Sequence, residues 1–467
     1  MMKALVGIAS YGTGNDEHLH RLLEEYRRMR SDVDIVVFSN IAKQLGPGVE
    51  VVVGLPATNP WSLPFAHKRL FAERLNRYDL FIYSEDDTLI EERNIEAFLR
   101  VTKILPAGLI AGYLRTERAR DGKVYFSTVN SHFHWDPASV TTLGEYTFAY
   151  FSNEHSACYL LTREQLKKAI ESGGFLIGPH EGRYDLLVTA ATDPYAQCGF
   201  RKMVCISHLD DFTVRHLTNK YVGRMGLEAS DLYRQIDVLL RIERDHLPKE
   251  VLFNPETKVF HAKWSKNYYE PSCPEMVSLI PRDACSVLSV GCGWGALEGE
   301  LVQKGLRVVA VPMDSVIASC AKARGVEIIY GDLEAARKQL SRERFNCLVV
   351  SNVLHLVEEP LKWVSTFVEL LSDHGMVIVK VPNFAQVTTV WRRFRREPGY
   401  QDLGDYGKSG VHLTTPGIIR EWFQRCGLAV GRTVCMIPQR GHLAHWVTLG
   451  LADPLLAEEL MVVGTKN

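Results

Sequence analysis

The sequence predicts an α/β protein of two domains, each built on a mostly parallel sheet. Continuous apolar runs such as KALVGIAS (3–10) have the pattern of strands buried on both faces. They alternate with amphipathic segments such as DEHLHRLLEEYRRM (16–29), and this alternation stops near residue 225 and resumes near residue 286. The length of 467 residues also suits more than one domain. We therefore expect an N-terminal domain, a helical and loop-rich linker and a C-terminal domain, at 1–225, 226–275 and 276–467.

The individual strands follow from short apolar runs bounded by turn residues. In the first half these runs are DIVVFSN (34–40), VEVVVGL (49–55), DLFIYSE (79–85) and GLIAGYL (108–114). In the second half they are SVLSVG (286–291), LRVVAV (306–311), VEIIYG (326–331), NCLVVSN (346–352) and GMVIVKV (375–381). Between the two sets, ASDLYRQIDVLLRIERDHL (229–247) predicts a connecting helix.

Composition narrows the class of protein. Apolar residues make up 46% of the chain and charged residues 23%, as in globular proteins, and the formal charge of -1 offers no overall field for nucleic acid. The N-terminal apolar run is too short for a signal peptide or a membrane helix. Ten cysteines occur without a C-x-x-C pair, which favours reduced thiols. We expect a cytoplasmic protein without a transmembrane segment or a nucleic-acid partner.

Three consecutive acids, Glu85, Asp86 and Asp87, follow the apolar run 79–84. Adjacent carboxylates repel one another unless water or a cation separates their charges. One interpretation is an acidic loop that caps the next helix. The other is a site for Mg²⁺ or Mn²⁺ at the carboxyl end of a strand, where open parallel sheets bind ligands.

The stretch FAHKRLFAERLNRYDLFIYSEDDTLI (65–90), together with ALVGIASYG (4–12), resembles glycosyltransferases of the GT-A fold. This resemblance covers about residues 1–225 and implies a nucleotide-sugar donor bound through Mn²⁺ or Mg²⁺. It implies that Asp87 ligates the metal and that Glu85 approaches the metal or the ribose. Glu85 stands where the family more often has Asp.

The same resemblance implies roles for other residues. Ser10 and Tyr11 would lie near the nucleobase, and Lys68 or Arg69 would meet phosphate. For the acceptor side it implies Asp185 as catalytic base, with two rival acids, and a late histidine as a further metal ligand. The rivals of Asp185 are Glu181 and Asp193. The histidine candidates are His208 and His216, and we prefer His216 because it follows the strand-like FTV (212–214).

In the second half, SVLSVGCGWGALEGELVQKG (286–305) places Gly291, Gly293 and Gly295 between a strand and a helix. The later segments YGDLEAA (330–336), SNVLHLVEEPLKWV (351–364) and GVHLTTPGI (410–418) follow in the order of class I S-adenosylmethionine-dependent methyltransferases, which residues 275–467 resemble. The resemblance implies S-adenosylmethionine as cofactor, with the three glycines along its methionine and ribose. It also implies that Asp332 accepts from the adenine amine.

This half departs from the family at two acidic positions. Ser289 and Pro312 stand where the family has carboxylates, and Asp314 is a possible substitute for the second. If the domain is active, His355 or His412 would accept the proton of an acceptor hydroxyl. If it is not, the domain would serve in binding or dimerisation.

The basic segment WRRFRREPGY (391–400) falls where such methyltransferases cover their acceptor. It is either a solvated helix face or a contact for an anionic glycan or lipid diphosphate. Together these observations predict a bifunctional enzyme that glycosylates and methylates one glycan or glycoside acceptor. The alternatives are a glycosyltransferase with a non-catalytic methyltransferase-like module, and a methyltransferase with an inert N-terminal recognition domain.

Overall fold

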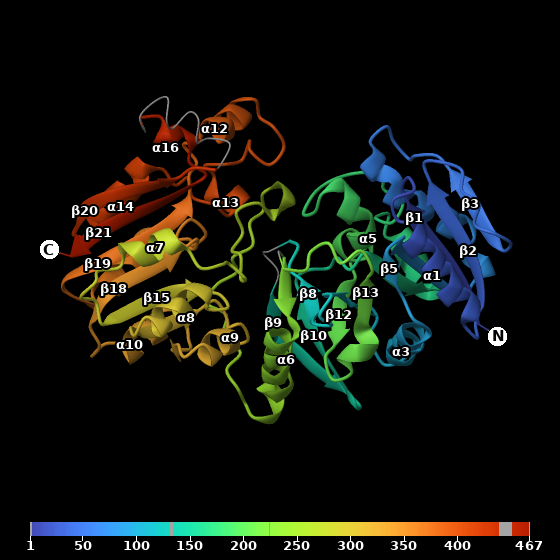
Figure 1. The fold of residues 1–467 in the computed structure, drawn as a ribbon, viewed down its shortest axis with the longest axis horizontal. Coiled ribbons are helices and arrows are strands. Elements are labelled where there is room, and N and C mark those ends of the chain that lie inside the picture. The colour runs from blue at the N-terminus through green and yellow to red at the C-terminus, as the bar shows by residue number, and fades with distance from the viewer. Residues whose placement is uncertain (1, 131–133, 224, 439–450, 467) are drawn as a thin grey trace. The chain divides into compact units, whose positions relative to one another are not determined.

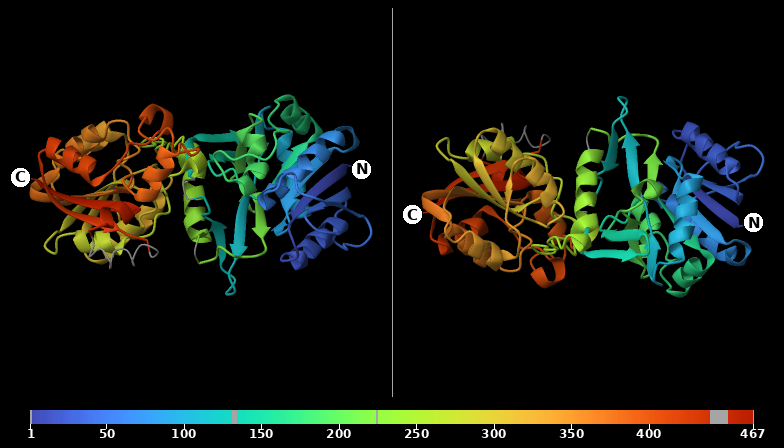
Figure 2. Two further views of the ribbon diagram at one scale, coloured as in Figure 1. Left: turned by 90° about the horizontal axis from the view of Figure 1, so that it is seen from above. Right: turned by 90° about the horizontal axis from the view of Figure 1, so that it is seen from below.

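The computed structural model describes residues 2–130, 134–223, 225–438 and 451–466. Within these residues the chain forms two compact units, one of 2–130 and 139–244 and the other of 134–138 and 245–466 (Figures 1 and 2). The division falls inside the predicted linker, because helix α6 (Ala229–Arg244) packs on strands of the first unit. Tyr233 of α6, for example, contacts Phe126 edge to face.

The first unit is built on a five-stranded sheet with the order β11-β4-β1-β2-β3. Strands β1 to β4 are parallel and β11 runs antiparallel to β4. The bounds are β1 (Lys3–Ser10), β2 (Asp32–Ser39), β3 (Val49–Val53), β4 (Leu80–Glu85) and β11 (Cys158–Thr162). The helices of this unit are α1 (Asp16–Arg28), α2 (His67–Glu73), α3 (Glu92–Thr102), α4 (Arg163–Glu171), α5 (Leu186–Ala196) and α6.

Two further sheets of the first unit were not predicted as sheets, although the predicted run 108–114 contributes β6 and the strand-like 212–214 lies at β13. One has the order β6-β12-β10-β9 and the other β14-β8-β7-β13-β5. Most of their strands are short and partly polar, so they lack the apolar runs that marked the others. Their bounds are β5 (Thr88–Leu89), β6 (Leu109–Ala111), β7 (Leu114–Arg118), β8 (Val124–Ser127), β9 (Trp135–Leu143, of which 135–138 are assigned to the second unit), β10 (Tyr146–Phe151), β12 (Arg201–Cys205), β13 (Thr213–His216) and β14 (Gly226–Glu228).

The second unit has a seven-stranded sheet with the order β17-β16-β15-β18-β19-β21-β20. Strands β15 to β19 are parallel, and β21 is antiparallel to both of its neighbours. The strands are β15 (Ser286–Cys292), β16 (Arg307–Pro312), β17 (Glu327–Ile328), β18 (Phe345–Ser351), β19 (Leu371–Pro382), β20 (Leu428–Met436) and β21 (Glu459–Lys466). The helices are α7 (Pro274–Leu279), α8 (Ala296–Gln303), α9 (Ala318–Ala323), α10 (Leu333–Gln339), α11 (Pro360–Val368), α12 (Val387–Phe394), α13 (Tyr406–Ser409), α14 (Pro416–Arg425) and α16 (Asp453–Leu456).

The predicted α/β class is confirmed, and the second unit has the Rossmann-like arrangement expected of a methyltransferase. In both main sheets the strand order reverses beside the first strand, between β1 and β4 and between β15 and β18. Such a reversal opens a crevice at the carboxyl ends of the strands, where ligands bind. No helix among the described residues combines the length and apolar character needed to cross a bilayer.

Candidate functional site

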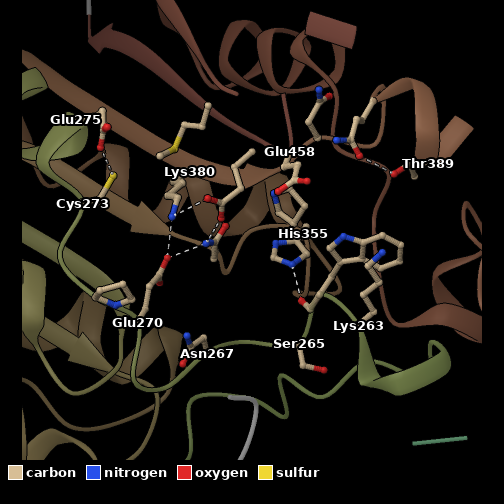
Figure 3. Close-up of a pocket in the computed structure, with 18 of the residues that line it drawn as sticks. Lys263, Ser265, Asn267, Glu270, Cys273, Glu275, His355, Lys380, Thr389 and Glu458 are labelled. Carbon is tan, nitrogen blue, oxygen red and sulfur yellow. Dashed lines mark hydrogen bonds and ion pairs between the residues drawn. The ribbon is translucent and has the colours of Figure 1, made fainter. Parts of the chain in front are cut away.

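A cavity of about 720 Å³ lies at the carboxyl edge of the second sheet (Figure 3). Strand β18 leads into it through Asn352, strand β19 through Lys380, and strand β21 begins there at Glu459. The segment 263–275, which precedes the first strand of this unit, forms another wall. A cavity of this volume is large enough for a small organic ligand.

A buried ionic cluster occupies one wall of the cavity. Glu270 accepts from Lys380 at 3.0 Å, from Lys266 at 2.8 Å and from the amide of Asn352 at 2.8 Å. Lys380 also pairs with Glu459 at 3.1 Å. Burial by itself would raise the pKa of Glu270, but the two lysines outweigh it and lower the pKa to about 2. Glu270 is therefore a fixed anion that positions the strand ends around it.

The two histidines predicted as proton acceptors lie in different places. His355 lines the large cavity, and its Nε2 lies 2.9 Å from the main-chain oxygen of Trp264. With Nε2 as the donor, Nδ1 is an acceptor, and it has no partner among the described residues. His412 lines a separate cavity of about 230 Å³ and stacks on Tyr406. The geometry therefore favours His355, because His412 lies outside the large cavity, and a role for His412 stays a prediction.

Burial lowers the pKa of His355 to about 4, so its ring is neutral at physiological pH. A neutral imidazole with a free nitrogen is able to accept a proton across the whole physiological range. The low pKa makes it a weak base, so it would take up a proton only as the reacting hydroxyl loses it.

The glycine loop after β15 is covered by the chain itself. A β-carbon on Gly293 would lie 2.2 Å from the main-chain oxygen of Tyr268, and the amide of Trp294 donates to that same oxygen at 2.9 Å. The indole nitrogen of Trp294 donates to the main-chain oxygen of Glu270 at 2.8 Å. The space left against the loop is about 20 Å³, room for about one water molecule. A cofactor along this loop needs the segment 268–271 to move.

The other predicted cofactor residues differ in exposure and in the hydrogen bonds that they already make. Gly291 and Gly295 have φ values of +78° and +82°, so both positions favour glycine. Asp332 is exposed and caps α10 by accepting from Ala335 at 2.8 Å, which leaves carboxylate capacity for a ligand. Asp314 is buried, and its side chain accepts hydrogen bonds from two main-chain amides. Its main chain forms an isolated antiparallel β-bridge with residue 251. Burial raises the pKa of Asp314 to about 7.

Glu298 supplies an acid beside the position where Ser289 replaces one. Ser289 donates to Glu298 at 2.6 Å, and both side chains are buried beside the glycine loop. Helix α8 thus presents a buried carboxylate to the end of β15. In chemical type these residues fit S-adenosylmethionine, since the loop offers main-chain groups, Glu270 and Glu298 line the space beside it, and Asp332 offers an exposed carboxylate at the start of α10.

In the first unit, the predicted acids lie at the crevice between β1 and β4. Residue 9 pairs with Glu85, so Ser10 and the acids share one edge of the sheet. Tyr11 is half exposed there. Asp86 accepts from Asn15 at 2.7 Å, while one oxygen each of Glu85 and Asp87 is buried without a partner among the described residues. Burial, reinforced by Asp87, raises the pKa of Glu85 to about 8.

The pairing of β13 with β5 brings His216 beside Asp87. Nε2 of His216 lies 2.9 Å from Oδ2 of Asp87, and Nδ1 lies 2.5 Å from Glu117. Burial would lower the pKa of His216, but these two carboxylates outweigh it and raise the pKa. Both ring nitrogens are therefore held by acids.

The structure brings together Asp87 and His216, two of the three predicted metal ligands. Within the described ranges, however, no three His, Cys, Asp or Glu side chains are arranged to hold a metal ion. His216 would have to release Asp87 or Glu117 to present a nitrogen to a metal. The unpartnered oxygens of Glu85 and Asp87 do fit a divalent cation, which takes hard oxygen ligands and completes its shell with phosphate and water.

The structure gives Lys68 a structural partner in place of the predicted phosphate contact. Lys68 and Asp193 form a buried ion pair, and His180 contacts the same carboxylate at 3.3 Å. Asp193, a rival candidate for the base, lies inside α5 and is fully buried. Asp185 caps α5 by accepting from Val188 at 3.1 Å and is partly exposed. Its role as a base stays a prediction.

Sequence reasoning missed the ionic cluster around Glu270. Two signals were present: Lys380 interrupts the apolar run GMVIVKV, and Lys266 stands four residues before Glu270. A charged residue within a buried strand indicates a buried counter-charge. The partner of Lys380 was not identifiable from the sequence, because Glu270 lies 110 residues away in the chain.

Comparison with known proteins places the second unit. Residues 273–399, less than half of the chain, match a family model described as methionine biosynthesis protein MetW. Ubiquinone biosynthesis O-methyltransferases of Cereibacter sphaeroides are 28% identical over 108 residues, which is 22% of this chain and 44% of theirs. The chain thus spans less than half the length of these curated relatives.

Solved structures are also similar to part of the chain. An S-adenosylmethionine-dependent methyltransferase from Mesorhizobium loti has a TM-score of 0.31 and 17% identity, covering 41% of this chain and 96% of that one. Magnesium protoporphyrin IX methyltransferase from Synechocystis has a TM-score of 0.30 and 16% identity, with coverages of 41% and 78%. Scores this low carry no argument about chemistry. The family model and the curated relatives show that the C-terminal region resembles class I S-adenosylmethionine-dependent methyltransferases.

Proposed function

We propose that this chain is a bifunctional transferase whose second unit methylates an acceptor. The observation that carries the methyltransferase proposal is the 720 Å³ cavity at the carboxyl ends of β18 and β19, which shares Glu270, Pro271 and Cys273 with the small space against the glycine loop. Bound along that loop, S-adenosylmethionine supplies an electrophilic methyl group. Gly291, Gly293 and Gly295 would hold it through the main chain, together with Asp332.

The residues of this chain would then prepare the acceptor. His355 lines the cavity and accepts the proton of the reacting hydroxyl at Nδ1, because Nε2 donates to Trp264. The Glu270–Lys380 pair holds the ends of the segment 263–275 and of β19 together, which keeps the cavity walls in place. The segment 268–271, which covers the loop through Tyr268 and Trp294, would move aside to admit the cofactor.

Calorimetric titration with S-adenosylmethionine tests this proposal. The wild-type protein is expected to bind it, and Asp332→Ser is expected to bind about tenfold more weakly, since one hydrogen bond to a charged group is lost. Serine keeps the helix cap, so the loss reports the ligand contact. Asp283→Ser, at an exposed turn acid to which no ligand contact is assigned, is the matched control. No heat at millimolar cofactor contradicts the proposal and supports the alternative of a non-catalytic binding module.

That alternative rests on two specific observations. The segment 268–271 fills the space along the loop, and the strand acids of the family are replaced by Ser289 and Pro312. In that case the second unit holds an acceptor in the large cavity without transferring a methyl group to it.

For the first unit we propose a metal-dependent glycosyltransferase that uses a nucleotide-sugar donor and a glycan or glycoside acceptor. The unpartnered buried oxygens of Glu85 and Asp87, with His216 adjacent, support it. Mn²⁺ or Mg²⁺ held there would stabilise the charge of the departing diphosphate. Ser10 and Tyr11, on the same edge, would meet the nucleotide, and Asp185 is the proposed base.

Nucleotide-sugar hydrolysis or transfer, assayed with Mn²⁺ across a donor panel, tests this second activity. Asp87→Asn is expected to abolish turnover, whereas Asp121→Asn, a matched change in an exposed turn, leaves it unchanged. Turnover by Asp87→Asn in the presence of chelator contradicts the proposal. That outcome supports the alternative of a methyltransferase with an inert N-terminal recognition domain.

A further inference from the structure

Helix α12 of the second unit exposes an apolar stripe to solvent. Val387, Val390, Trp391 and Phe394 follow the spacing of one helix face, and Phe394 is 86% exposed. Thr389, on the opposite side, is buried. A helix on a globular protein normally turns its apolar face toward the core, so α12 is oriented in the reverse sense.

Four arginines stand at the same end of α12. Arg392 donates to Tyr400 at 2.9 Å and pairs with Glu397 at 3.6 Å. The other three, Arg393, Arg395 and Arg396, are exposed and form no ion pair within the part of the chain that the structure describes. These arginines are therefore available to an external anion.

The arginines and the apolar stripe form one surface. The guanidinium of Arg395 lies 4.6 Å from the ring centre of Trp391, so charge and aromatic face are adjacent. Helix α16 lies beside the start of α12, where Gln386 donates to the oxygen of residue 456 at 3.4 Å. Leu455 of α16 is half exposed there. We call Val387, Val390, Trp391, Phe394 and the four arginines the α12 patch.

We propose that the α12 patch binds the surface of an anionic lipid bilayer. Aromatic and branched side chains on one helix face enter the boundary between headgroups and acyl chains, and flanking arginines meet lipid phosphates. The chain has a formal charge of only -1, so this positive charge is a local feature of the patch. A short helix with one such face gives reversible binding that depends on anionic lipid and on salt.

A second copy of the chain fits this patch less well. A two-fold interface places the same patch on both sides, so the arginines of one copy would face those of the other. An anionic bilayer supplies the opposite charge and an apolar layer together. Thr388, Thr389 and Arg392 also line the 720 Å³ cavity, so docking would bring that cavity to the lipid headgroups.

Co-sedimentation with phosphatidylcholine vesicles, with or without phosphatidylglycerol, tests the proposal. The wild-type chain is expected to bind vesicles that contain phosphatidylglycerol and to be released by salt. The paired change of Trp391→Glu and Phe394→Glu is expected to lower the partition coefficient at least tenfold. Trp61→Glu is the matched control, since Trp61 is as exposed as Trp391 but lies in the first unit.

A second variant separates the electrostatic part. Arg395→Glu with Arg396→Glu is expected to lower binding to anionic vesicles about 25-fold, at roughly fivefold for each arginine. Arg120→Glu, at an exposed position of the first unit, should leave it unchanged. Circular dichroism confirms that each variant folds.

Three outcomes overturn the proposal. The first is that the wild-type chain does not bind anionic vesicles at low salt. The second is that the Trp391 and Phe394 variant binds them as well as wild type. The third is a wild-type dimer in light scattering that this variant dissociates, which would assign the patch to a second copy.

Discussion

Replacing Glu270 by glutamine should destabilise the second unit by several kcal/mol at neutral pH. The change removes the carboxylate that faces Lys266 and Lys380, whose side chains are almost fully buried. The fall of the Glu270 pKa from its usual 4.5 to about 2 corresponds to about 3 kcal/mol of stability. Removing one partner of a buried pair costs a similar amount, about 3–5 kcal/mol.

The pH dependence has a definite sign. The folded-state pKa of Glu270 lies below its unfolded value, so this stability is complete above about pH 5 and is lost as the pH falls toward 2. The difference between wild type and Glu270→Gln should therefore shrink by about 1 kcal/mol at pH 4 and by about 2 kcal/mol at pH 3. The variant itself lacks this titration.

The assay is equilibrium unfolding in urea followed by a brief deuterium pulse. Peptides from β18 and β19 then report the second unit separately from the first. Glu327→Gln is the matched control, because Glu327 pairs with Arg307 on the exposed edge of the same sheet and should cost about 1 kcal/mol or less. A cost below about 1 kcal/mol for Glu270→Gln, or an equal cost at pH 7 and pH 3, would refute the reasoning.

Three further predictions concern single positions. Gly293→Ala should destabilise the second unit by about 1–3 kcal/mol in thermal unfolding, because its β-carbon meets the main-chain oxygen of Tyr268; an unchanged midpoint contradicts this. His355→Ala should slow methyl transfer about a hundredfold or more, while His412→Ala leaves it nearly unchanged. The wild-type rate should show no inflection from His355 near pH 6.5, since the pKa of His355 is lowered to about 4; equal effects of the two alanine variants would count against His355. Asp193→Asn should cost the first unit about 3–5 kcal/mol in the urea assay, since it leaves Lys68 buried without a counter-charge, and a loss under about 1 kcal/mol would disprove that role.

Much of the fold was predictable because it depends on local periodicity. The continuous apolar runs became β1 to β4 and β15 to β19, and the helix periodicity of 16–29 became α1. Most of the short strands in the first unit's other two sheets were missed, apart from β6 in the predicted run 108–114 and β13 at the strand-like 212–214. They carry no run long enough to distinguish them from loops, and their pairing depends on partners distant in the chain.

The sequence predicted where the candidate site residues lie better than it predicted which side chains they contact. The acids at 85–87 and the glycines at 291–295 do lie at the carboxyl edges of their sheets, because a strand followed by a turn places them there. Lys68, in contrast, was assigned to phosphate and is buried with Asp193. A helix pattern shows which face is apolar, but it does not show which buried acid pairs with a lysine on that face.

The sequence by itself determined that there are two α/β units, where the strand ends lie, and which glycines and acids stand at those ends. These properties follow from side-chain periodicity and backbone preference, which act over a few residues. Only the tertiary structure decided that His216 meets Asp87, that Glu270 meets Lys380, and that Tyr268 covers the glycine loop. Such contacts join residues far apart in the chain, so they are set by strand register and by packing of whole segments, which no local pattern encodes.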